Sequence, residues 1–354
     1  MIQKPVSTTR NFHRVPGIVG SLLILLLAGL FPPSGLAQSS VALVGSGSTV
    51  PVPLYRRWSE EFNKRSPDVQ MQYVPLGTGE GIRQISHGIG DFGAGEVPLT
   101  DKERSEGNLM ELPVMLIGIV PIYNLPQIHQ ELRFSGELLA DIFLGRVKTW
   151  NAPAIERLNP GVALPDLPIR VVYRPGGKGT NYVFTEFLSK TSSKFKTQIG
   201  TNASPAWPIG MAADRSSDMA DAVKNAPGSI GYVELQYAQR SNIQNGLVLN
   251  ASGKFVKASP ATITAACQAV ETPHWDKFSA SLTNAPGGDS FPITSFTWVY
   301  LKTKHSDPHR AAALLRLLNW MFSDGQPLGN QLGYSELPRP LLEELKAKVN
   351  SIRW

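Results

Sequence analysis

The chain of 354 residues contains a single cysteine and few histidines. Cys267 cannot form an internal disulfide, and its apolar neighbours predict a buried, unreactive thiol. Of the six histidines only His305 and His309 are close in sequence, and Pro308 between them disfavours a shared helix face. With no third ligand nearby, we expect no metal site and no cofactor.

The motifs of common catalytic sites are also missing. No serine stands in a Gly-x-Ser-x-Gly turn with a histidine and an acid to activate it. The turn at residues 177–180 is not a nucleotide phosphate loop, because Lys178 is followed by glycine. Gly45 and Gly47 follow a strand as in dinucleotide sites, but Val50 occupies the third glycine position. The sequence therefore predicts a protein that is not an enzyme, with an exported phosphatase as the less favoured alternative.

Charge of one sign is not in large excess. Charged residues make up 18% of the chain, and the formal net charge is +6. Half of that excess comes from Lys4, Arg10 and Arg14, and no basic run is interleaved with aromatic residues. Because this is not the pattern of a nucleic-acid-binding protein, we expect no nucleic-acid partner.

No apolar run near the N-terminus is long enough for a membrane anchor, which needs about 20 residues. A basic start is followed by an apolar run at residues 18–31 and by Gly-Leu-Ala at residues 35–37. This order predicts a cleaved secretory signal peptide over residues 1–37. Since no cysteine stands at the cleavage site, we expect a soluble periplasmic protein without a lipid anchor.

The remainder of the chain is too long for one core. Of the 354 residues, 317 follow the signal peptide, so two lobes are expected. Short apolar strands alternate with helical patterns, which predicts α/β lobes with largely parallel sheets. Apolar runs at 112–123 and 291–300 are long enough to cross between lobes. We therefore assign residues 38–117 and 292–354 to lobe I and residues 118–291 to lobe II, with a small-ligand cleft between them.

Three short turns rich in glycine, serine and threonine each follow an apolar strand and open a helical pattern. They lie at residues 45–49, 77–81 and 176–180. A glycine turn lets the backbone approach a ligand, and the first amides of a helix carry partial positive charge. Three such turns predict a tetrahedral oxyanion held by converging helix ends.

The helices expected after the first two turns have apolar stripes. These stripes are Leu54, Trp58 and Phe62 after the first turn, and Ile82, Ile85 and Ile89 after the second. Two further helices, at 311–321 and 340–349, are expected to pack back onto lobe I.

Six segments occur in an order that is typical of one known family. They are residues 45–53 (GSGSTVPVP), 91–99 (DFGAGEVPL), 142–151 (IFLGRVKTWN), 174–180 (RPGGKGT), 227–234 (PGSIGYVE) and 291–294 (FPIT). From about residue 41 to the C-terminus, the chain resembles the periplasmic phosphate-binding protein of the high-affinity phosphate ABC transporter. The resemblance implies a two-lobed periplasmic binding protein of the Venus-flytrap type, with two crossover hinge strands. It further implies a monomer that captures inorganic phosphate and delivers it to the membrane permease of an ABC importer.

The resemblance also assigns phosphate ligands by position. These are Thr49 and the amide of Val50 from the first turn, Thr78 from the second, Glu96, and Arg174, Lys178, Gly179 and Thr180 from the third. Some depart from the family's usual residues, which are an aromatic at 50, serine at 78 and 178, and aspartate at 96. Gly176 also replaces an aspartate that would pair with Arg174, so Arg174 is expected to be less restrained and more electropositive.

Each assigned side chain has a physical role and a simpler alternative. The guanidinium of Arg174 suits two oxyanion oxygens. Glu96 can accept a hydrogen bond from the proton that hydrogen phosphate carries and sulfate lacks; the alternative is a salt bridge to Arg174 or Lys178 with no ligand role. The threonine hydroxyls either donate to the anion or cap their own helices. Lys178 adds a point charge, extends into solvent or pairs with Glu96. Because of the departures, a binding protein for another oxyanion, such as arsenate, or one of low selectivity, is the alternative.

Overall fold

The computed structural model describes residues 40–270 and 278–354. The predicted signal peptide therefore lies outside the described residues. The strands are β1 Val41–Gly47, β2 Val69–Pro75, β3 Phe92–Gly95, β4 Leu109–Tyr123, β5 Arg133–Phe134, β6 Arg170–Tyr173, β7 Met211–Ala212, β8 Ser229–Glu234, β9 Gln244–Asn245, β10 Leu247–Leu249, β11 Phe255–Val256 and β12 Thr294–Lys302. The helices are α1 Val52–Arg65, α2 Thr78–Ser86, α3 Asp101–Ser105, α4 Gly136–Phe143, α5 Pro153–Glu156, α6 Gly179–Thr191, α7 Ser193–Gln198, α8 Ser216–Lys224, α9 Leu235–Arg240, α10 Pro260–Gln268, α11 Pro308–Met321, α12 Gly325–Gln331 and α13 Arg339–Ser351. None of the helices in these two ranges is both long enough and apolar enough to span a membrane.

Nine strands of the described chain form one sheet, in the order β2-β1-β3-β12-β4-β8-β6-β7 with β9 beside β4. The outer pairs β1–β2, β1–β3, β6–β8 and β6–β7 are parallel, whereas β4 and β12 run antiparallel to each other and to their neighbours. The expectation of largely parallel sheets is therefore wrong for the centre. The reason is geometric: one long strand carries the chain out of the first group of elements and the other returns it, so the two strands run in opposite directions.

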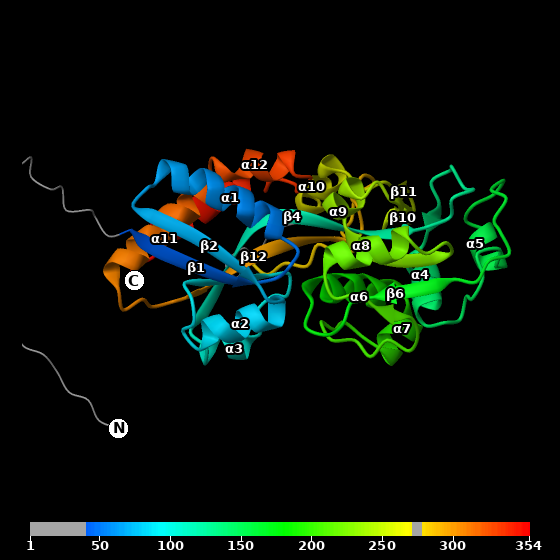
Figure 1. Cartoon of the computed structure of the whole chain (residues 1–354), viewed down its shortest axis with the longest axis horizontal. Helices are drawn as coiled ribbons and strands as arrows, with labels where there is room; N and C mark the ends of the chain where they lie inside the picture. The colour runs from blue at the N-terminus through cyan, green and yellow to red at the C-terminus, as the bar shows by residue number, and fades with distance from the viewer. Residues whose placement is uncertain (1–39, 271–277) are drawn as a thin grey trace, which may run out of the picture. The chain divides into compact units, whose positions relative to one another are not determined.

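Strand β4 changes partner part of the way along its length. Its residues 109–118 pair with β12, and its residues 119–123 pair with β8. The long buried strand expected at 112–123 is confirmed, with three more residues at its start. In Figure 1 β4 and β12 run together between the elements around β1 and those around β6.

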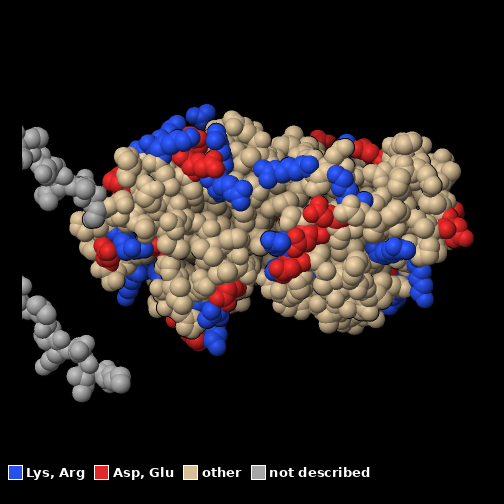
Figure 2. All heavy atoms as spheres, in the orientation of Figure 1, with Lys and Arg blue, Asp and Glu red and all other residues tan. Residues whose placement is uncertain are grey.

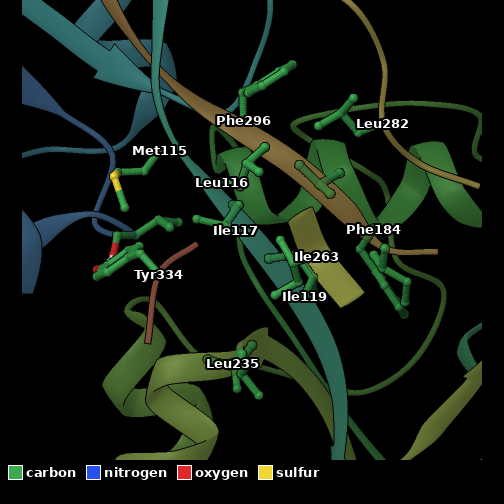
Figure 3. Packing of buried hydrophobic residues seen from close by; sticks show 14 of the residues in the cluster. Met115, Leu116, Ile117, Ile119, Phe184, Leu235, Ile263, Leu282, Phe296 and Tyr334 are labelled. Atoms are coloured by element: carbon green, nitrogen blue, oxygen red, sulfur yellow. Dashed lines mark hydrogen bonds between the residues drawn. The ribbon is translucent and has the colours of Figure 1, made fainter. Parts of the chain in front are cut away.

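Apolar side chains pack on both sides of β4. Met115, Leu116, Ile117 and Ile119 are all almost completely buried. Figure 3 shows these side chains along the strand, among residues from segments that are far apart in the sequence. The neighbours labelled there are Phe184, Leu235, Ile263, Leu282, Phe296 and Tyr334. Because burial of each large apolar side chain is worth about 1.5–3 kcal/mol, this strand anchors the core on both of its faces.

All three predicted strand–turn–helix units are present: β1 leads to α1, β2 to α2 and β6 to α6. The stripe of α1 is buried as expected. The stripe of α2 is buried at Ile82 and Ile85, but Ile89 is 51% exposed, so that part of the prediction is wrong. The helix ends at Ser86, and Gly88 then adopts a φ of +73°, which turns the chain out of helical geometry.

The C-terminal helices pack back onto the first group of elements, as predicted. Helix α11 contacts β1, α1 and α13. The guanidinium of Arg310 donates to both carboxylate oxygens of the buried Asp91, at 2.9 and 2.7 Å, and to the carbonyl of Ala42. This two-point ion pair fixes α11 to the strands that carry the first turn.

Cys267 is buried on α10, as the sequence predicted. Burial raises the pKa of its thiol to about 12. Since the thiolate is the reactive form, the side chain behaves as a small apolar residue.

We predict that Gly81→Ala destabilises the protein by about 1–3 kcal/mol, because the added methyl group has no room. A Cβ at this position would lie 2.6 Å from the Cα of Gly47 and 2.8 Å from the carbonyl oxygen of Ser46, and both are backbone atoms. Gly79→Ala in the same helix is the control, because its Cβ would approach no atom closer than 3.9 Å. Urea unfolding measures both variants, and equal losses of stability would contradict the packing explanation.

Candidate anion site

Glu96 follows β3 and is completely buried. Its Oε2 accepts hydrogen bonds from the Ser48 hydroxyl at 2.6 Å and the Thr78 hydroxyl at 3.2 Å. Its Oε1 accepts one from the Thr297 hydroxyl at 3.0 Å. Residues that are far apart in the sequence thus meet at one carboxyl group. The sequence had indicated Thr78, but Ser48 and Thr297 were missed.

The pKa of Glu96 is raised to about 7, mainly by burial, and the nearby carboxylate of Glu234 contributes to the rise. The hydrogen bonds from the three hydroxyls oppose this rise because they stabilise the ionised form. No cation pairs with Glu96 within the described chain, so the alternative of a salt bridge to Arg174 or Lys178 is not what the structure has. The carboxyl group is therefore free to change its protonation near neutral pH.

Arg174 follows β6 and is also completely buried. Its Nη1 donates to the Ser216 hydroxyl at 3.0 Å, and its Nη2 donates to the Asp214 carbonyl at 2.7 Å and to Thr49 Oγ1 at 3.2 Å. The expectation of a less restrained side chain is thus wrong, because these neutral oxygens hold the guanidinium in place of the missing aspartate.

The charge of Arg174 nevertheless has no carboxylate partner among the described residues. Its Nε donor is buried and makes no hydrogen bond there. An unpaired buried cation with an unused donor is costly unless something negative binds beside it. The arrangement therefore fits an anion that is not part of the chain.

The third turn places Lys178, Gly179 and Thr180 next to these two groups. A Cβ on Gly179 would lie 2.2 Å from Glu96 Oε2, so only glycine fits this close approach. Lys178 Nζ pairs with Asp214 at 2.7 Å rather than with Glu96. The amide of Gly79 donates to the Gly177 carbonyl at 3.3 Å, so the second and third turns also touch.

None of the three threonines caps its own helix. The N-cap residues of α1, α2 and α6 are Pro51, Gly77 and Lys178, and none makes a side-chain cap bond. The hydroxyls of Thr49, Thr78 and Thr180 contact Arg174, Glu96 and Glu234 instead. The capping alternative is therefore wrong: no side chain caps the first amides of these helices, although the Gly79 amide of α2 donates to the Gly177 carbonyl.

Thr180 leads to a residue that sequence reasoning missed. Its hydroxyl donates to Glu234 Oε1 at 2.7 Å, and both side chains are almost completely buried. Glu234 Oε2 has no partner within the part of the chain that the structure describes. Glu234 closes the segment 227–234 that the sequence singled out, but its 54-residue separation from Thr180 gave no local signal.

Val50 is buried, and its backbone is engaged on both sides. Its amide donates to the Ser48 hydroxyl at 3.1 Å, and its carbonyl accepts from Tyr334 at 2.8 Å. The Ser48 hydroxyl in turn donates to Glu96. The Val50 amide, which the sequence assigned to the phosphate, is therefore directed to Ser48 in this structure.

A cleft of about 630 Å³ adjoins this site. Its wall includes Thr49, Ser216 and Lys178, which also contact Arg174 or its neighbours. Its other lining residues include four arginines, Arg56, Arg57, Arg215 and Arg240, with Glu60 and Asp214 beside them. Figure 2 shows basic side chains over α1 and onward in the direction of α8. Such a basic approach attracts small anions.

Comparison with known proteins agrees with this geometry. Residues 33–325 match the model of the PBP superfamily domain. The phosphate-binding protein PstS of Xylella fastidiosa (strain 9a5c) is 35% identical over 317 residues, covering 89% of this chain and 87% of that protein. The PstS of Pasteurella multocida (strain Pm70) is 34% identical over 325 residues, covering 92% of this chain and 94% of its own.

Solved structures show the same fold. A putative phosphate ABC transporter substrate-binding protein from Clostridium perfringens, with bound phosphate, has a TM-score of 0.62 at 18% identity, covering 84% of this chain and 100% of its own. The phosphate-binding protein of Stenotrophomonas maltophilia has a TM-score of 0.65 at 17% identity, covering 87% and 94%. The fold is thus that of the two-lobed α/β binding proteins, as predicted. Within that class, the chain belongs to the PstS family of phosphate-binding proteins.

We predict that Glu96 makes the stability of the ligand-free protein depend on pH. Its pKa is about 7 in the folded protein, against 4.5 for the unperturbed group in the unfolded chain. Between these two pH values Glu96 is mostly protonated in the folded protein and mostly ionised in the unfolded chain. The free energy of unfolding therefore falls as pH rises across this window, by about 3 kcal/mol at most.

Urea unfolding at a series of pH values tests this, with Glu96→Gln as the comparison. Because glutamine does not titrate, the free energy of unfolding of the variant should fall less with pH than that of the wild type. The pH dependence that comes from all other groups should be the same in both proteins. Parallel curves for the two proteins would show that Glu96 does not titrate in this range.

Proposed function

We propose that the chain captures inorganic phosphate in the anion site and delivers it to the permease of an ABC-type importer. The observation that carries this proposal is the buried guanidinium of Arg174, which has no carboxylate partner and an unused Nε donor in the described chain. An oxyanion beside it supplies both the missing charge and the missing acceptor. The names of the PstS relatives support phosphate as that anion.

The carboxyl group of Glu96 supports selectivity for a protonated anion. A carboxylate accepts a hydrogen bond from a phosphate hydroxyl, whereas sulfate has no proton to donate near neutral pH. An unpaired acceptor facing sulfate in a buried site is costly. We therefore expect phosphate and arsenate to bind and sulfate to be excluded.

The proposed ligand set keeps the residues expected from the sequence. It consists of Thr49, Val50, Thr78, Glu96, Arg174, Lys178, Gly179 and Thr180. Lys178 acts through its charge, because its Nζ pairs with the exposed Asp214 and stays at the wall of the basic cleft. The helix ends at Gly179 and Thr78 supply amides with no cap of their own.

The proposed boundary between the lobes lies where β4 changes its partner strand. We propose residues 38–117 with 292–354 as lobe I and residues 118–291 as lobe II, and the change of partner after Gly118 supports that boundary. Under this division, the hydrogen bond from Gly79 to Gly177 and that from Arg174 to Thr49 join the two lobes. Such contacts belong to a closed conformation, with β4 and β12 as the hinge strands.

We further propose that the protein is exported and acts as a binding protein in the periplasm. Residues 1–37 serve as a cleaved signal peptide, and the mature protein is a periplasmic monomer that presents the closed lobes to the permease. It performs no covalent chemistry. The names of the relatives, which are binding proteins, support this part of the proposal.

Calorimetric titration of the mature protein with phosphate, arsenate and sulfate tests the function. Heat with phosphate and none with sulfate supports it, equal heat with sulfate removes the role of Glu96, and no heat with any anion refutes the function. Release of nitrophenol from nitrophenyl phosphate would instead indicate a phosphatase.

We predict that Arg174→Gln lowers phosphate affinity at least roughly 100-fold, because two or more charge-assisted hydrogen bonds are lost. Arg170→Gln is the matched control, since Arg170 is exposed at the start of the same strand. It removes the same charge and should leave the affinity nearly unchanged. Equal losses in both variants would mean that long-range attraction, and not contact, binds the anion.

A further inference from the structure

Glu234 is a second buried carboxyl group at the anion site, and it has a distinct position in the fold. It is the last residue of β8 and the N-cap of α9, and it pairs with Ile119 of β4. It is fully buried, with Oε1 bonded to Thr180 and Oε2 without a partner in the described chain. A buried carboxylate oxygen with no donor is costly, so it marks a place where a donor is expected to bind.

The bond to Glu234 changes what Thr180 can offer to a ligand. A hydroxyl has one proton to donate, and that of Thr180 is directed to Glu234. Toward the anion, Thr180 Oγ1 then presents a lone pair rather than a proton. The hydroxyls of Ser48, Thr78 and Thr297 are likewise directed to Glu96, so hydrogen-bond acceptors face the ligand near both carboxyl groups.

The other groups near Glu234 do not supply the missing proton. Its negative charge helps to raise the pKa of Glu96 and of the hydroxyls of Tyr232, Tyr237 and Tyr334. These three hydroxyls donate to Asn181, to the carbonyl of Thr49 and to the carbonyl of Val50, respectively. The cations in this region are Arg174, held by Ser216, Thr49 and the Asp214 carbonyl, and the exposed Arg56 and Arg240.

We propose that Glu234 is a specificity-determining residue that accepts a second ligand proton, so that the site takes the singly charged, doubly protonated form of phosphate. This inference rests on the proposed function. One phosphate hydroxyl donates to Glu96 and the other to Glu234, while the two bare oxygens face Arg174 and the first amides of α6. Two carboxylates beside one arginine repel a dianion more than a monoanion, which favours the same form.

Calorimetry of the full mature chain with inorganic phosphate from pH 5.5 to 8.5 tests the proposal. For the wild type, affinity for total phosphate should fall by roughly tenfold for each pH unit above neutrality, because the monoanion becomes scarce. Titrations in two buffers of different ionisation enthalpy should show uptake of close to one proton per phosphate at pH 8. This measurement needs no variant, and affinity that is equal at pH 6 and pH 8 without proton uptake would overturn the proposal.

Glu234→Gln is the specific variant. Glutamine keeps the acceptor for Thr180 but places an amide donor where Oε2 was, so it suits a bare oxygen of the ligand. We expect the phosphate affinity of the variant to depend less on pH than that of the wild type. The factor by which affinity falls between pH 6 and pH 8 should be at least about tenfold smaller, and sulfate binding should become measurable. Glu111→Gln is the control, because Glu111 is buried with Leu99 and Arg104 as its partners and should leave the profile unchanged.

A purely structural role for Glu234 predicts a different result, namely the same loss of affinity at every pH with sulfate still excluded, and that result would refute the proposal. No phosphate binding by the wild type at any pH would instead refute the proposed function. The two failures are therefore distinguishable.

Discussion

The two-sided pairing of β4 is the constraint on which the rest of the structure depends. One continuous strand belongs to two groups of elements, since its first ten residues pair with β12 and its last five with β8. The turns that carry the proposed ligands follow strands on either side of this junction. Their relative position is therefore set by a backbone ladder, and a small change of twist at the junction moves Arg174 with respect to Glu96.

Buried charge is the second organising feature. Arg174, Glu96 and Glu234 are fully buried, and no ion pair within the described ranges joins them. Groups of this kind cost stability until their partners arrive. Under the proposed function, an anion that binds beside these groups offsets part of this cost, and the hydroxyls around each of them lower it in the ligand-free protein.

Much of the fold and part of the site could be predicted from the sequence, because the signals were local. The three glycine turns, the stripe of α1 and the long apolar run of β4 each lie within a short window. The prediction for Ile89 failed because a single glycine ended the helix one turn early. Ser48, Thr297 and Glu234 were missed because their partners lie 48, 201 and 54 residues away, and only folding brings them together.

The bond between Thr297 and Glu96 can form only late in the synthesis of the chain. Synthesis proceeds from the N-terminus, so Glu96 and Arg174 both exist long before the strand that carries Thr297 is added. That strand is also the return half of the β4–β12 pair. A growing chain therefore contains these charged residues well before it contains the hydroxyl of Thr297 and the partner strand of β4.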